Sequence, residues 1–417
     1  MKYLKLFKTH TKYETYSSEE MILPNVSKCI LEDEVHYNPW TWADEYLTFV
    51  AKESGTFTFT PQNSNVISYS IDDGITWTNG NSVNVGNGNK VMWKGTMTPS
   101  SSGIGTFSST AEFDVQGNVM SLLYGDNYKG QINLTGKNYA FYSLFSRNTK
   151  IVNAENLSLP ATTLVEGCYQ GMFYNCTNLT VAPALPATIL AEACYCYMFQ
   201  GCTSLTLAPE LPATTLTDSC YNSMFSGCTS LVKAPELPAI TLATSCYASM
   251  FQGCAGLIIA PELPATTLAK NCYFSMFYNC TSLTTAPELS ATTLISTCYS
   301  HMFRGCINLL AAPALPATTL AGSCYYYMFD GCTNLTTAPE LPATTLVSGC
   351  YSYMFNACTK LNYIKAMFTT TPSSTYTSNW VSGVASTGTF VKNIGASWTT
   401  TGVNGIPSGW TIQTASA

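Results

Sequence analysis

The sequence predicts an α+β repeat protein, in which a curved solenoid with one short strand and one short helix per unit follows an all-β domain and precedes a β cap. Two observations predict the solenoid: two columns of cysteines recur every 26 residues, and an apolar pattern recurs with them. A third observation, a run of short strand-like segments before the repeats, predicts the all-β domain. A fixed period of about 20 to 50 residues is typical of chains whose units stack on one another.

The repeats fill residues 151–358 as eight units of 26 residues without an insertion. Each unit approximates LPATTLxxxCYxxMFxGCTSLxxAPE, and the five repeated residues of the first unit lie between Cys168 and Cys176. On a helix these five positions fall within about 140° of one another, and the positions that vary between units face the other way. We therefore expect a short amphipathic helix in every unit.

The residues that follow this segment predict how the helix ends and what comes next. Glycine or asparagine recurs just before the second cysteine, as at Asn175 and Gly201, and these residues suit a left-handed C-cap. Leu179 and Leu185 recur as apolar positions of a short strand, which Pro183 should end. Strands stack about 4.8 Å apart and helices about 8 to 10 Å apart, so we expect a concave strand side and a convex helix side.

The segment MFxGCTSLxxAPELP resembles the core of the BspA-type leucine-rich repeats of bacterial surface proteins, in a 26-residue variant of the kind found in gut Bacteroidetes and their phages. Two departures from the commonest pattern are a longer unit and Met-Phe in place of Ala-Phe. The resemblance covers about half of the chain. It implies a leucine-rich-repeat solenoid and a non-enzymatic, exposed role in binding or adhesion.

The chain divides into four expected parts: an N-terminal attachment segment, an Ig-like β-sandwich, the leucine-rich-repeat solenoid and a tryptophan-containing C-terminal cap, at residues 1–45, 46–137, 138–366 and 367–417. The first part weakly resembles the opening of structural proteins from gut Bacteroidetes phages, which implies attachment to a larger particle. In the sandwich, Asp73-Gly74 predicts a hairpin turn. Its strands are expected at 46–50, 55–60, 66–71, 75–77, 90–93, 103–107 and 118–123.

Three tryptophans, Trp380, Trp398 and Trp410, lie in the expected cap. We expect them to cover the last repeat. A tryptophan-lined sugar site is the functional alternative for the same residues.

Composition excludes several functions. Only 10% of the 417 residues are charged and the net charge is −6, so no basic surface for nucleic acid is expected. No apolar run is long enough to span a membrane, and the first ten residues lack the apolar stretch of a recognisable signal peptide. We expect an extracellular protein, on a cell surface or on a virion.

The cysteine columns are expected to be buried free thiols, because an offset of eight helical residues places the two cysteines of one unit about 12 Å apart. Disulfides between some of them are the alternative. No catalytic residue, metal ligand or cofactor is expected, since the three histidines lie far apart in the sequence and no nucleotide or nucleophile motif occurs. Two alternatives stay open. A calcium site is one, on the column Glu210, Glu236, Glu262, Glu288 and Glu340; an enzyme that uses Asp72, Asp73 and Glu112 is the other.

Two surfaces are candidates for binding a glycan or a protein ligand on a cell surface. Aromatic and polar residues that suit such contacts are expected on the convex face of four successive units, at Phe274, Tyr278, His301, Arg304, Tyr326, Tyr327, Asp330 and Tyr353. The competing concave face offers Lys233, Ile258, Ile259, Leu310 and Tyr363. A recognition or adhesion protein, with a receptor-binding virion component as one form of it, is the preferred function. A purely structural spacer without a ligand is the alternative.

Overall fold

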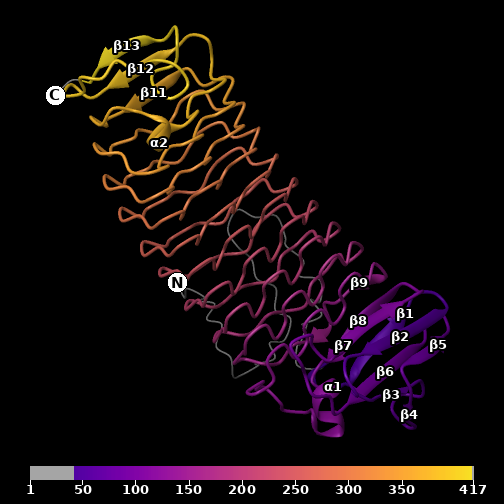
Figure 1. The fold of residues 1–417 in the computed structure, drawn as a ribbon. Helices are drawn as coiled ribbons and strands as arrows, with labels where there is room; N and C mark the ends of the chain where they lie inside the picture. The colour runs from indigo at the N-terminus through magenta and orange to yellow at the C-terminus, as the bar shows by residue number, and fades with distance from the viewer. Residues whose placement is uncertain (1–41, 416–417) are drawn as a thin grey trace, which may run out of the picture. The chain divides into compact units, whose positions relative to one another are not determined.

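The computed structural model describes residues 42–415 (Figure 1). Except for its last four residues, the expected attachment segment 1–45 lies outside the described part of the chain. The description begins with a short 3-10 helix, η1 (Trp42–Asp44).

Strands of the first part of the described chain form two sheets. The larger sheet has the order β10-β8-β1-β6-β3-β4, and β9 also pairs with β8; the smaller has the order β5-β2-β7. The bounds are β1 (Leu47–Ala51), β2 (Gly55–Pro61), β3 (Ile67–Ser70), β4 (Thr78–Asn79), β5 (Ser82–Val85), β6 (Lys90–Gly95), β7 (Gly105–Ser109), β8 (Phe113–Asn118), β9 (Ile151–Asn153) and β10 (Leu157–Ser158).

Aromatic side chains hold these two sheets together. Phe49 on β1 contacts Phe57 on β2 and Phe107 on β7, with ring centroids 5.8 and 4.9 Å apart. The hairpin between β3 and β4 is confirmed, and Asp73 and Gly74 have positive φ, as a turn of this kind requires.

Two of the strand predictions were wrong, and one strand was missed. Residues 75–77 belong to the hairpin loop, β5 has no counterpart among the expected strands, and only the first residue of 118–123 is in a strand. The rest of that last segment leads into α1 (Ser121–Tyr124) and the 3-10 helix η2 (Gly125–Asn127).

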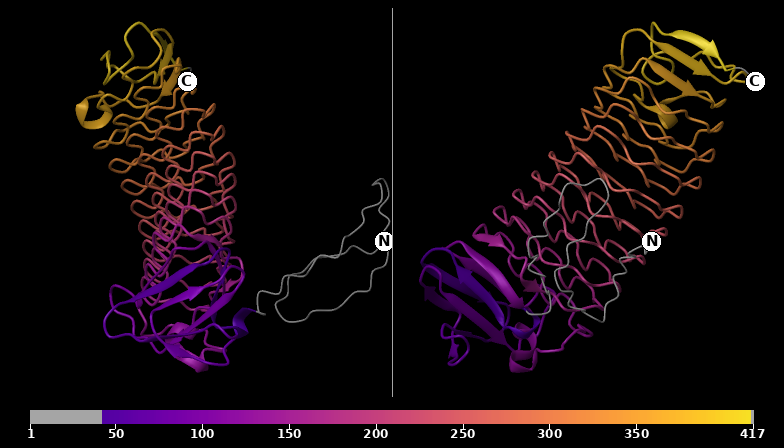
Figure 2. Two further views of the ribbon diagram at one scale, coloured as in Figure 1. Left: turned by 90° about the vertical axis from the view of Figure 1, so that its right-hand side faces the viewer. Right: turned by 180° about the vertical axis from the view of Figure 1, so that it is seen from behind.

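The prediction of a short helix in every unit is wrong. None of the eight units contains a helix, and the only strands in them are β9 and β10 at the start of the first unit. From there to β11 (Tyr363–Ala366) the chain forms turns and isolated β-bridges (Figures 1 and 2). We call each 26-residue unit a rung, numbered from 1 (151–176) to 8 (333–358). The side formed by residues 165–176 and their equivalents is the turn side, and the side of the Val181 column is the bridge side.

Backbone hydrogen bonds explain why turns replace the helix. In rung 1 the N–H of Met172 donates to the carbonyl of Tyr169 and closes a turn, whereas the next N–H, of Phe173, donates to Met198 in rung 2. The same alternation runs from residue 167 to 176 and recurs in the other rungs. Half of the donors thus hold the next rung, whereas in an α-helix they would bond within their own segment.

This backbone requires a left-handed residue at every fourth position, at Gly167, Gly171 and Asn175 in rung 1, with φ of 57°, 60° and 56°. The left-handed conformation expected at Asn175 and Gly201 is therefore confirmed, although it belongs to a turn and not to a helix cap. The apolar face is also confirmed, because Cys168, Met172 and their equivalents are fully buried.

Ring stacks run through the core of the rungs. Equivalent tyrosines, from Tyr169 to Tyr351, lie 5.7 to 6.0 Å apart between ring centroids, and equivalent phenylalanines, from Phe173 to Phe355, lie 5.6 to 5.8 Å apart. These spacings are close to the separation of paired strands and well below that of packed helices. The contrast in spacing from which a convex helix side was predicted is therefore absent.

The layered arrangement continues beyond both ends of the eight rungs, by ring stacking at the first end and by strand pairing at the last. Phe145, which lies 28 residues before Phe173, stacks on it at 5.3 Å and on Phe107 of β7 at 5.8 Å. At the other end, β11, β12 (Thr389–Lys392) and β13 (Thr411–Thr414) pair in parallel, and a short helix, α2 (Ser374–Thr377), lies between β11 and β12.

The three C-terminal tryptophans are buried, and each indole N–H donates to a backbone carbonyl. Trp380 lies against Tyr351 and Phe355 of rung 8, at 6.4 and 6.2 Å between ring centroids. A sugar platform needs exposed ring faces, so the alternative use of these tryptophans as a sugar site is wrong.

Burial of the cysteine columns is confirmed. All 17 described cysteines, which are those of the two columns and Cys196, are buried free thiols. In the second column each thiol donates to the carbonyl of a phenylalanine in the preceding rung, as Cys306 does to Phe277 at 3.0 Å. Burial raises the pKa of Cys306 to about 12.

We predict that Phe251→Asp removes a central ring from the phenylalanine stack and buries an unpaired carboxylate. The free energy of unfolding should fall by about 3 to 5 kcal/mol. The neighbouring Gln252→Asp places the same charge at a partly exposed position and should change stability little. Chemical denaturation of both variants tests the register, and equal losses would contradict it.

We predict that the thiols of both columns resist alkylation in the folded protein. Burial blocks access to the sulfur, and the raised pKa keeps the thiol protonated, whereas the thiolate is the reactive form. A Cys29→Ser variant, which removes the one cysteine outside the described residues, should incorporate almost no iodoacetamide in native buffer by intact-mass measurement. In denaturant it should incorporate 17 equivalents, one for each described cysteine. Rapid native labelling of several cysteines would show that the rungs open.

Candidate functional site

All eight residues expected on the convex face come together on the turn side of rungs 5 to 8. They occupy three columns, named after the rung 1 residues Gln170, Gly171 and Tyr174. The Gln170 column supplies Phe274 and Tyr326, the Gly171 column supplies His301, Tyr327 and Tyr353, and the Tyr174 column supplies Tyr278, Arg304 and Asp330. We call these eight residues the aromatic patch.

The centre of the patch is a stack of three rings in the Gly171 column. His301 and Tyr327 lie 4.9 Å apart with an interplanar angle of 13°, and Tyr327 and Tyr353 lie 4.3 Å apart with an angle of 2°. All three have left-handed backbones, with φ of 59°, 56° and 57°. Bulky residues rarely adopt this conformation and retain it where their surroundings impose it, often at functional positions.

Rungs 3 to 5 show that the rings are not needed to form the turn. Their residues in the same column are Ser223, Ser249 and Ser275, each with φ of 53°. Small residues form this turn equally well, so the turn does not require the rings that rungs 6 to 8 carry.

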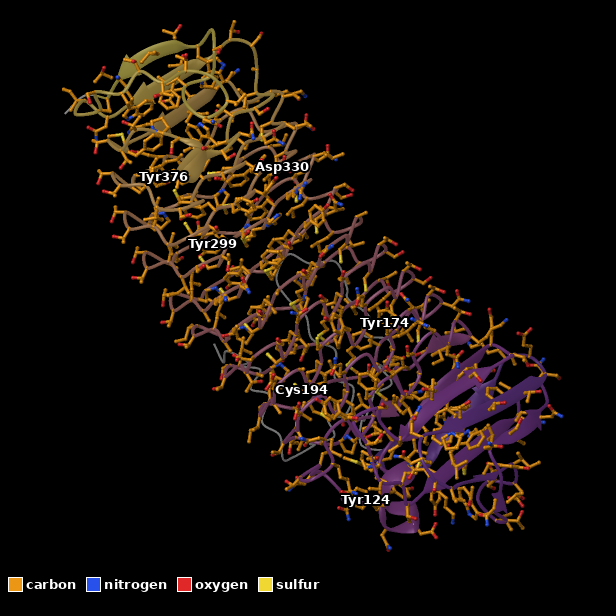
Figure 3. All side chains as sticks on the ribbon, viewed as in Figure 1. Tyr124, Tyr174, Cys194, Tyr299, Asp330 and Tyr376 are labelled. Atoms are coloured by element: carbon orange, nitrogen blue, oxygen red, sulfur yellow. The ribbon has the colours of Figure 1, made fainter. Side chains whose placement is uncertain are left out.

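A polar ladder runs beside the stack in the Tyr174 column. Arg304 Nε pairs with Asp330 Oδ2 at 2.7 Å, and the amide of Asn356 in rung 8 donates to Asp330 Oδ1 at 2.7 Å. The guanidinium also lies over the rings of Tyr278 and Tyr327, at 5.5 and 4.6 Å. Asp330, labelled in Figure 3, has a side chain only 9% exposed, so it anchors the half-exposed Arg304 in one orientation.

The remaining two aromatic residues flank the stack. Phe274 lies 5.2 Å from His301, and Tyr326 lies 5.4 Å from His301 and 4.5 Å from Tyr327. Edge-on and tilted contacts of this kind contribute about 0.5 to 1.5 kcal/mol each beyond the area they bury. The patch is thus organised before any partner arrives.

Three residues of the patch surroundings were missed from the sequence. Besides Asn356, these are Ser300, whose hydroxyl lies 2.8 Å from His301 Nδ1, and Asn379, whose amide donates to the Tyr353 hydroxyl at 3.2 Å. No sequence signal could have found them, because small polar residues are common in these columns and Asn379 lies beyond the last regular repeat.

Burial, with a smaller contribution from Arg304, lowers the pKa of His301 to about 4. The imidazole is therefore neutral at pH 7, and the patch carries only the mutually neutralising charges of Arg304 and Asp330. Burial and the neighbouring tyrosines raise the pKa of Tyr327 to about 12, so its hydroxyl stays protonated.

The bridge side brings together only part of the expected concave surface. Ile259 forms a β-bridge with Lys233 of the preceding rung, and Ile258 and Ile259 are about half exposed. Leu310 lies two rungs beyond Ile258, and Tyr363 lies a further two rungs away. These five residues therefore do not form one site.

Among residues 42–415, no group of three or more histidine, cysteine or carboxylate side chains is placed to hold a metal ion. The glutamates of the calcium alternative are exposed, and Glu340 pairs with Lys365 at 2.9 Å. Asp72 accepts hydrogen bonds from Ser70 and Thr76 within its own loop. It follows β3, whereas Glu112 precedes β8, and these two strands are separated by β1 and β6. Three strand spacings amount to roughly 14 Å, more than a pair of glycosidase carboxylates needs.

Within the same described range, the structure has no helix long and apolar enough to cross a membrane.

Rungs that stack by parallel bridges, with leucines of a fixed period lining the core, define a leucine-rich-repeat protein. The family model of the BspA-type leucine-rich-repeat region matches in six copies, over 137–257, 192–336 and 270–381. Because these matches together span more than half of the chain, the protein belongs to the BspA-type leucine-rich-repeat family. Proteins of this family are generally surface-associated and serve as non-enzymatic binding scaffolds. No match was found among curated proteins or among solved structures.

We predict a pH-dependent loss of stability that belongs to His301. The pKa of His301 is near 6.5 in the unfolded chain and about 4 in the folded protein, so between these pH values the unfolded chain binds more protons. The free energy of unfolding should therefore fall as the pH drops from 6.5 to 4. Because the ring is only partly shielded from water, we expect a loss of no more than about 2 kcal/mol.

The matched control is His301→Tyr, which continues the tyrosines of the next two rungs without a group that titrates in this range. Thermal unfolding of both proteins from pH 7 to pH 4 isolates the histidine, since the other titrating groups are shared. Parallel pH profiles for the two proteins would show that His301 is protonated in the folded state as readily as in the unfolded chain.

Proposed function

We propose that the protein is a non-enzymatic recognition or adhesion protein that binds a partner on a cell surface through the aromatic patch. In this proposal residues 138–366 form a leucine-rich-repeat solenoid, residues 46–137 an Ig-like β-sandwich at its start and residues 367–417 a cap at its end. The two sheets before rung 1 and the parallel strands β11 to β13 after rung 8 support this division.

The observation that carries the proposal is the concentration of eight aromatic and charged residues on four consecutive rungs. In the same three columns rungs 3 and 4 carry only small or amide side chains, namely Asn222, Ser223, Ser226, Ala248, Ser249 and Gln252. Tyrosine and arginine are the residues most enriched where binding energy concentrates in protein interfaces. Arg304 is held in place by Asp330, so little side-chain freedom is lost when a partner binds.

The geometry favours a protein partner over a glycan at this patch. Sugars bind tyrosine by lying on the face of the ring. In the stack of His301, Tyr327 and Tyr353 the inner faces are covered by neighbouring rings. Ring edges, hydroxyls and one guanidinium are left for the partner, which suits the mixed surface of a protein.

A location outside the cell, on a cell surface or on a virion, accords with the family, whose members are generally surface-associated. For the virion form, residues 1–45 are the segment that would attach to the particle, and the patch would bind a bacterial receptor. Mass spectrometry of purified particles and of washed intact cells from the native source distinguishes these two locations.

A purely structural spacer is the second candidate. The observation that favours it is that the patch rings stack between rungs, which stabilises the array whether or not a ligand exists. The two candidates differ in what happens when outward rings are removed.

The test is the binding of fluorescently labelled protein to intact cells from its native source, measured by flow cytometry. The variant Tyr326→Ser/Tyr327→Ser gives rung 7 the serines that rungs 6 and 4 carry in these two columns, so it should fold. We expect it to bind at least tenfold more weakly, which corresponds to about 1.4 kcal/mol or more. Digestion of the cells with proteinase K should abolish binding of the unmodified protein.

The matched control, Ile258→Thr/Ile259→Thr, removes two exposed side chains from the bridge side and copies Thr284-Thr285 of the next rung. Its binding should be unchanged. Binding that survives in both double variants would favour the spacer, and binding that resists the protease would make the partner a glycan.

A further inference from the structure

A hollow lies at the opposite end of the turn side, away from the aromatic patch. It spans the segment before rung 1, rung 1 itself and rung 2, and its lining includes Tyr142, Arg147, Gln170, Tyr174, Tyr197 and Gln200. Tyr174, labelled in Figure 3, occupies the column that carries Asp330 six rungs later. None of these six residues belongs to the patch proposed above.

The hollow exists because rung 1 has no side chain in the Gly171 column. The other seven rungs carry tyrosine, histidine or serine there. At Gly171 an added Cβ would lie 3.4 Å from Ser143 Oγ and 3.7 Å from Tyr174 Cβ, which are ordinary contact distances. A larger side chain at this position would therefore fill the floor of the hollow without a clash at its first carbon.

Arg147 gives the hollow a free positive charge. Its side chain is exposed and lies over the Tyr174 ring at 5.9 Å, and among the described residues it forms no ion pair with a carboxylate. Arg304 in the patch differs in this respect, because Asp330 neutralises it. An unpaired guanidinium in a partly enclosed polar site favours a ligand with a carboxylate, which it binds in a bidentate manner.

The remaining lining groups suit the hydroxyls and ring faces of a sugar. Gln170 and Gln200 provide amide donors and acceptors, and Tyr197, 38% exposed, provides a ring beside them. The backbone at the floor is already used: the N–H groups of Ser143 and Gly171 donate to the next rung. An extended peptide therefore finds no free strand edge here. We propose that this hollow binds a saccharide that carries a carboxylate group.

Isothermal titration calorimetry of the full chain tests this proposal with two acidic probes and their neutral counterparts. The pairs are tetragalacturonic acid with its methyl ester, and 3′-sialyllactose with lactose. We expect at least one acid to bind at least tenfold more tightly than its neutral partner. Arg147→Asn should remove that preference. Asparagine suits the left-handed backbone at this position, because Asn175 occupies the equivalent turn position of rung 1.

Two matched pairs of variants control the experiment: Gly171→Tyr with Ser249→Tyr, and Arg147→Asn with Lys270→Gln. Gly171→Tyr should abolish binding by filling the floor, while Ser249→Tyr, in the same column of rung 4, should leave binding intact. Lys270→Gln removes one positive charge outside the hollow and should also leave binding intact.

Three results would overturn the proposal: no preference for either acid, a preference that survives in Arg147→Asn, or tighter binding of a hexaglutamate peptide than of both acids. The variant Tyr326→Ser/Tyr327→Ser should bind the saccharide normally. Failure of this proposal is thereby separated from failure of the proposed protein-binding patch.

Discussion

The whole array depends on the way in which backbone N–H groups alternate between two sets of carbonyls. In each turn segment one N–H closes a turn in its own rung and the next donates to the following rung, as Met172 and Phe173 do. The chain can alternate in this way only if every fourth residue is left-handed. These inter-rung bonds fix the register, so equivalent residues lie directly above one another. Core columns then become continuous ring stacks, and the backbone N–H groups of the turn segments are paired, as a folded core requires.

Fixed register separates the core from the surface. Inward columns repeat almost without change, because a ring or thiol in one rung packs against its copies in the rungs on either side. Outward columns are under no such constraint, and one column carries glycine at Gly171, serine at Ser249 and a ring at Tyr327 on the same backbone. The outward side chains can therefore differ from rung to rung without altering the fold. The aromatic patch uses three of these columns, and the hollow uses the same three columns together with residues of the segment before rung 1.

The buried face could be predicted from the sequence, but its secondary structure could not. The repeated residues from Cys168 to Cys176 are separated alternately by one and three positions, so the pattern has a period of four. Over nine residues a turn repeat of four and a helical repeat of 3.6 place these residues on the same side. The signal that separates the two is a left-handed residue at every fourth position. Glycine and asparagine reveal it in the Asn175 column, whereas serine, histidine and tyrosine conceal it in the Gly171 column. The patch residues were predictable because they vary and face outward under either model. The hollow was not, since it follows from a missing side chain at Gly171 and from a 28-residue offset between Phe145 and Phe173 that sets the preceding segment.

Charge gives the two ends of the turn side different chemistry. With only 42 charged residues in 417, each exposed charge has few neighbours to offset it. Arg304 is paired with Asp330 and His301 is neutral, so the patch presents no net charge and its contacts depend on shape and on ring edges. Arg147 has no such partner among residues 42–415, so a carboxylate in the hollow would meet a guanidinium whose charge is not already neutralised there. Long-range attraction contributes little in either case, because the field of a few separated charges is screened within about 10 Å at ordinary ionic strength. Selectivity at both ends must then come from side chains in direct contact, which are the positions that the backbone ladder leaves free to vary.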